Sequence, residues 1–127
     1  MPLAEDITAP EIEFERGDKK IMMRFDHNQM RASEYYWQMT VRTRLGYIGI
    51  LNQAVSRTYC GLGALAYGAL ASHEMAHNAR RRELPDVAAF DRIWDLGILL
   101  DIAEPMIKAA LSSLPSAPAS GGQEKNG

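Results

Sequence analysis

The alternation of apolar and charged residues near the N-terminus predicts a β-hairpin. Between positions 11 and 25, apolar side chains occupy every second position on both sides of the turn signal Arg16-Gly17-Asp18. Period-two alternation around a Gly-Asp turn is typical of two antiparallel strands with one buried face. Ile12 and Phe14 are expected on that face of the first strand, and Met23 and Phe25 on that of the second. Because an isolated hairpin is marginal in water, it is expected to pack on the rest of the chain.

Beyond the hairpin the apolar positions recur at helical spacing. Asp26 followed by Gln29 resembles a capping box and predicts the start of the first helix. The expected helices span residues 27–44, 50–57, 60–78, 87–94 and 98–111, with a polar connector at 80–85. The third helix is rich in glycine and alanine on all sides, so it is expected at the centre, where small side chains let neighbouring helices approach closely. Pro105 is expected to kink or divide the last helix.

These elements predict a mainly α fold with an N-terminal β-hairpin packed on a small bundle of four to five helices. A chain of 127 residues is large enough for one core. The expected organisation is a flexible lead at 1–10, a single domain at 11–113 and a disordered tail at 114–127. The tail is expected because its Pro, Gly and Ser content cannot bury a core.

Composition restricts the classes of function. The chain is 46% apolar and 24% charged, with a net charge of −2, which argues against a protein that binds nucleic acid through phosphate contacts. The single cysteine, Cys60, favours a reducing compartment. The N-terminus lacks the pattern of a signal peptide, and the most apolar run is shorter than the roughly 20 residues of a membrane span. We therefore expect a cytoplasmic protein without membrane segments.

The pattern His73-Glu74-Met75-Ala76-His77 matches the H-E-x-x-H motif of zinc peptidases. On a helix it places two imidazoles on one face as zinc ligands, with Glu74 as the base that polarises a bound water. A third ligand would have to come from elsewhere, and Glu104 or Asp101 is the expected donor. Against this hypothesis, the predicted upstream region supplies only one hairpin, whereas these peptidases hold substrate on a larger sheet.

Histidines near the C-terminus of a helix also have a simpler explanation, because they complement the helix dipole. The primary expectation is therefore a protein without metal, cofactor or catalytic residue. A small zinc peptidase with His73, His77 and Glu104 as ligands and Glu74 as base is the alternative.

The aromatic run Tyr35-Tyr36-Trp37 lies on the first predicted helix. Three consecutive residues span about 200° of a helix, so these rings cannot all face the core. One or two of them are therefore expected to be exposed, to cover the hairpin or to meet a partner, since exposed aromatic residues are enriched at interfaces. Together with Tyr47, they are the candidate partner-binding residues.

The layout of the chain resembles the tail assembly chaperones of long-tailed bacteriophages and of related prophages and gene-transfer elements. The resemblance covers roughly residues 10–114 and is one of layout and residue character. The matching parts are the hairpin leading directly into a helix, the small-residue segment at 62–70 with a following His-Glu, the acidic-aromatic segment at 84–95, and a final apolar helix ending in Ala109-Ala110-Leu111. The pair His73 and His77 departs from the usual appearance of this family.

The resemblance implies a non-catalytic protein that binds the tape measure protein during tail assembly and helps to recruit tail tube subunits. Such genes often encode a second, longer product through a ribosomal frameshift. The implied task requires exposed apolar surface that can self-associate or cover a helical client, and the outer face of the last helix is a further candidate for that surface.

Overall fold

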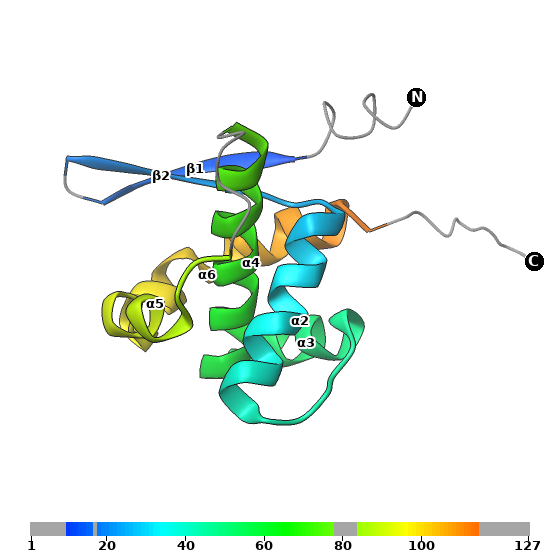
Figure 1. Cartoon of the computed structure of the whole chain (residues 1–127). Helices are drawn as coiled ribbons and strands as arrows, with labels where there is room; N and C mark the ends of the chain where they lie inside the picture. The colour runs from blue at the N-terminus through cyan, green and yellow to red at the C-terminus, as the bar shows by residue number, and fades with distance from the viewer. Residues whose placement is uncertain (1–9, 17, 78–83, 115–127) are drawn as a thin grey trace, which may run out of the picture.

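The computed structural model describes residues 10–16, 18–77 and 84–114, and its architecture is mainly helical with an N-terminal hairpin, as the sequence predicts (Figure 1). The expected lead at 1–10, the polar connector and the tail fall almost wholly outside these residues. Along the chain the elements are β1 (Glu11–Arg16), β2 (Lys19–Arg24), α2 (His27–Val41), α3 (Tyr47–Val55), α4 (Tyr59–His77), α5 (Val87–Ile93) and α6 (Leu96–Ser112).

The hairpin has the predicted alternation. β1 and β2 are antiparallel, with Ile12 opposite Met23 and Phe14 opposite Ile21. Met23 and the following Phe25 are fully buried, and the other three side chains pack against the core at partial exposure. The hairpin crosses α4 near the C-terminal end of that helix, so packing against helices supplies the burial that two strands cannot provide alone (Figure 1).

Helix α2 starts and ends with local caps. The Asp26 carboxylate accepts a hydrogen bond of 2.9 Å from the backbone N–H of Gln29, which satisfies one of the free donors at the helix start. The helix ends at Val41 because Arg42 adopts a left-handed conformation with a φ of 70°. It is therefore three residues shorter than the sequence predicts.

Helix α4 lies at the centre of the bundle, as its small residues predict, and contacts α2, α3, α5, α6 and β2. A Cβ atom at Gly68 would lie 2.2 Å from Ser33 Oγ and 2.4 Å from the carbonyl oxygen of Gln29. The backbones of α2 and α4 thus approach each other too closely for any side chain at position 68. Ser33 Oγ donates a hydrogen bond of 2.7 Å to the carbonyl oxygen of Ala64, which fixes this contact.

The remaining helices differ from the prediction mainly at their ends. α3 begins at Tyr47 and not at residue 50, and α6 begins at Leu96, where Asp95 caps it through the N–H of Ile98. Pro105 does not divide α6, and it lies on the exposed side of the helix. Within the described part of the chain, no helix combines the length and apolar character required to cross a membrane.

Candidate functional site

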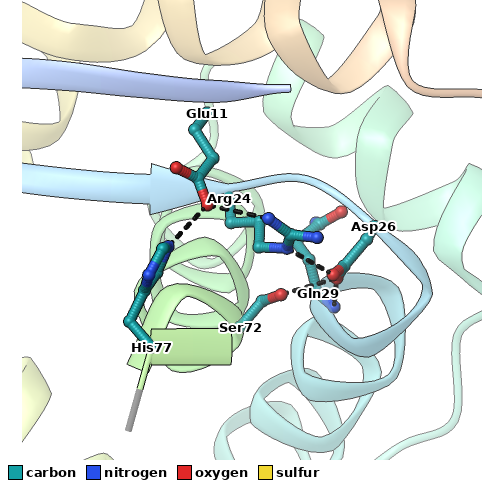
Figure 2. Close-up of polar contacts among 6 residues, drawn as sticks. All are labelled: Glu11, Arg24, Asp26, Gln29, Ser72 and His77. Carbon is teal, nitrogen blue, oxygen red and sulfur yellow. Dashed lines mark hydrogen bonds and ion pairs between the residues drawn. The ribbon is translucent and has the colours of Figure 1, made fainter. Parts of the chain in front are cut away.

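The last turn of α4 faces the open end of the hairpin through polar side chains (Figure 2). Glu11 at the start of β1 lies opposite Arg24 at the end of β2, and Arg24 Nη1 donates to Glu11 Oε2 over 2.8 Å. The same oxygen lies 2.9 Å from His77 Nε2. The carboxylate of Glu11 therefore links the two strands to α4.

Arg24 extends this network to α2. Its Nε donates to Asp26 Oδ2 over 3.0 Å, and Ser72 of α4 donates from Oγ to Asp26 Oδ1 over 2.6 Å (Figure 2). The Arg24 side chain is only 9% exposed. Burial opposes its charge, but the hydrogen bonds to Glu11 and Asp26 outweigh that cost and raise the pKa of its guanidinium. Charged partners thus compensate the buried charge.

His73 and His77 lie one turn apart on α4, with ring centroids 4.3 Å apart. Burial and the neighbouring His77 ring lower the pKa of His73, which favours the neutral imidazole. The hydrogen bond with His77 and the contacts with Arg24 lower the pKa of Glu11, against the opposing effect of desolvation. Both shifts favour the forms that bind metal ions, a neutral ring and an ionised carboxylate.

Glu11, His73 and His77 form a potential metal-binding group. One ligand atom from each residue lies within 4.8 Å of the others. Glu104, the third ligand expected in the alternative hypothesis, is not in this group. It is exposed on α6, whereas Leu99 and Met106 of the same helix are buried, so its side chain points away from the core. Glu74, which lies between the two histidines in the sequence, is half-buried.

Sequence reasoning missed Glu11. The strand pattern predicts that Glu11 faces away from Ile12, but it does not indicate which helix end lies on that side. A contact between residues 66 positions apart is decided by packing of the hairpin on α4. The sequence offered one indication only: Glu11 carries a carboxylate and lies in a hairpin that is predicted to pack on the rest of the chain.

The candidate partner-binding aromatics are mostly core residues, which corrects their expected exposure. Tyr36, Trp37 and Tyr47 are buried, and only Tyr35 is exposed. The centroid of the Tyr36 ring lies 5.2 Å from that of the Tyr67 ring and 5.5 Å from that of the Phe90 ring. Tyr36 and Trp37 are both buried because α2 has neighbours on more than one side. Tyr35 is 39% exposed, which confirms that the three rings of the run cannot all face the core.

Other apolar residues are exposed instead. Ile93 at the end of α5 is 66% exposed, and Leu96 and Leu100, one turn apart on α6, are 42% and 46% exposed. Residues four apart share one face of a helix. Leu96 and Leu100 therefore share an exposed face of α6, and these two residues together with Ile93 at the end of α5 are called the α5–α6 strip.

Comparisons with protein-family models, with curated protein sequences and with solved structures found no match to this chain. What can be concluded about function therefore depends on the residues and their arrangement.

Proposed function

We propose that this protein is a tail assembly chaperone of a long-tailed phage or a related element. Its client is the tape measure protein, its second partner is the tail tube protein, and it acts without catalysis. The proposal rests on the resemblance of layout described above. The observation that carries it in the structure is the α5–α6 strip, because a chaperone for a helical client needs accessible apolar side chains.

The position of the strip suits this task. Leu96 and Leu100 form an apolar ridge on α6, while Leu99 and Met106 on the adjacent face of that helix are buried in the core. A client helix can pack on this ridge without unfolding the bundle. Transient burial of a few leucines also suits a partner that must be released later, since small interfaces are weak.

Co-expression with the tape measure protein encoded in the same genome tests the proposal. The expected result is that the long helical client is soluble and co-purifies only when this chain is present. The double variant Ile93→Lys/Leu100→Lys is expected to abolish co-purification while the far-UV circular dichroism spectrum stays unchanged. A genome without such a neighbouring gene, or a client equally soluble alone, would contradict the proposal.

Val55→Lys is the matched control for that experiment. Val55 is 48% exposed on α3, so it matches Leu100 in exposure and apolar character but lies on another helix. Its substitution is expected to leave co-purification intact. Equal loss in Val55→Lys and in the double variant would mean that added positive charge, and not the α5–α6 strip, weakens the complex.

The zinc peptidase hypothesis is the second candidate, because Glu11 provides a third potential ligand next to His73 and His77. Two observations weigh against it. The described sheet has two strands only, and the carboxylate of Glu11 already forms an ion pair with the guanidinium of Arg24. Peptide hydrolysis by the zinc-loaded protein, lost in Glu74→Gln, would support this candidate. Absence of hydrolysis with zinc bound would leave the metal in a structural role.

A further inference from the structure

We infer that Glu11, His73 and His77 bind one divalent transition-metal ion, which fastens the open end of the hairpin to the last turn of α4. This site is independent of the proposed chaperone function, because it does not involve the α5–α6 strip. It differs from the site that the sequence predicts in its third ligand and in its role, since the ion joins two elements far apart in the chain.

The geometry is close to that of a bound ion. Zn–N and Zn–O bonds of about 2.0–2.2 Å place tetrahedral ligand atoms roughly 3.3–3.6 Å apart. His77 Nε2 and Glu11 Oε2 are 2.9 Å apart, so this pair must open by a few tenths of an ångström. The three ligand atoms lie within 4.8 Å of one another, so small side-chain rotations bring His73 into the same sphere.

The donor set selects the class of metal. Two imidazoles and one carboxylate suit Zn²⁺, Ni²⁺, Cu²⁺ or Co²⁺, whereas Ca²⁺ and Mg²⁺ require mostly oxygen ligands. In the protein without metal, the proton of a hydrogen bond lies between His77 Nε2 and Glu11 Oε2. A metal ion replaces that proton and is shared by all three ligands, which leaves a fourth position for water.

Arg24 limits the affinity but does not prevent binding. The contacts of the Glu11 carboxylate with Arg24 and with His77 both fall on Oε2. Arg24 and His77 therefore share this oxygen, so a metal ion bound through Oε2 requires the Arg24 ion pair to shift to Oε1, the other oxygen of the carboxylate. The positive charge of Arg24 is balanced by Asp26 at 3.0 Å, and Glu74 adds negative charge near His73.

Isothermal titration of the full, tag-free chain with ZnCl₂ tests the inference. We expect one Zn²⁺ per chain, and replacement by Co²⁺ should give the strong visible absorption of a tetrahedral site. His73→Ala and His77→Ala should each raise the dissociation constant by roughly 100-fold or more. Absence of stoichiometric binding to the folded wild-type chain overturns the inference.

His27→Ala is the matched control. His27 is the third histidine of the chain and is exposed at the start of α2, outside the proposed ligand group. Its removal should leave the dissociation constant unchanged within about twofold. If His27→Ala weakens binding as much as His77→Ala, the measured zinc is bound adventitiously by surface histidines and the site is refuted.

Glu11→Gln separates the three-ligand site from a simple pair of helical histidines. Glutamine keeps an oxygen acceptor for Arg24 but is a much poorer metal ligand, so we expect binding to weaken about tenfold or more. Zinc should also slow hydrogen exchange of the β1 amides in the wild-type chain and not in Glu11→Gln. Equal affinity and equal protection in this variant would overturn the role of Glu11.

Discussion

Glu11 and Arg24 are directly opposite each other at the open end of the hairpin, and an ion pair of 2.8 Å joins their side chains. Arg24 is also paired with Asp26, the residue that caps α2. A single buried guanidinium thus connects the pairing of two strands to the start of the first helix. This relationship explains how a short hairpin is held in place on the bundle.

Replacement of Arg24 should be strongly destabilising. Arg24→Met leaves the carboxylates of Glu11 and Asp26 without their positive partner in a partly desolvated site, so we expect a loss of about 3 kcal/mol in the free energy of unfolding. Urea denaturation measures this value. Lys20→Met is the control, because Lys20 is 67% exposed and 3.6 Å from Glu13. Such surface pairs contribute about 0–1 kcal/mol, and equal losses in the two variants would refute the importance of the Arg24 network.

Two glycines in helices should respond oppositely to alanine. At Gly68 a Cβ atom would collide with Ser33 and with the backbone of α2, whereas at Gly97 its nearest contact is 3.5 Å away. We expect Gly68→Ala to lose about 1–3 kcal/mol through overpacking. Gly97→Ala should gain about 0.5–1 kcal/mol from helix propensity. Thermal unfolding of both variants checks this, and a stable Gly68→Ala would contradict the close approach of α2 and α4.

Tyr36 should stabilise the contact between α2 and α5. Its hydroxyl donates a hydrogen bond of 2.5 Å to Asp91 Oδ1. Because hydrogen bonds to charged acceptors contribute about 1.5–3 kcal/mol, Tyr36→Phe should lower the free energy of unfolding by roughly that amount. Asp91→Asn keeps an acceptor and should cost less. Denaturant titration distinguishes the two variants, and a larger loss in Asp91→Asn would argue against this bond as the main contribution.

The protein should lose stability at alkaline pH. Burial raises the pKa of Tyr47 to about 12, and burial also raises the pKa values of Tyr36 and Tyr67. These groups ionise in the unfolded chain near pH 10, before they ionise in the folded protein. Their stabilising contribution is complete below pH 10 and is lost as the pH rises through the folded pKa values. Each group should lower the free energy of unfolding by about 1.4 kcal/mol per pH unit in that window.

Tyr47→Phe tests the alkaline effect. Between pH 10 and 12 the fall in stability should become shallower by about 1.4 kcal/mol per pH unit. At pH 7 the variant should be less stable than the wild type, because the Tyr47 hydroxyl donates to the buried Gln29 Oε1 over 3.2 Å. Denaturant titrations at several pH values measure both changes. An unchanged slope above pH 10 would mean that Tyr47 ionises equally easily in the folded and unfolded chains.

The sequence by itself determined the fold class and the nature of most elements. Period-two alternation identified the hairpin and its buried face, because each strand places successive side chains on opposite sides. Asp26 identified the start of α2 because a helix cap depends on residues only three apart. The density of small residues predicted α4 as the central helix, since the requirement for close approach is visible in composition alone.

Only the tertiary structure decided which surfaces are exposed and which distant residues meet. Tyr36, Trp37 and Tyr47 were expected at a partner surface, yet they are buried because α2 has neighbours on more than one side. The motif at 73–77 suggested two ligands, but the residue that joins them is Glu11 and not Glu104. Local spacing fixes which residues share a face of a helix, whereas the packing of hairpin against helix fixes what that face meets.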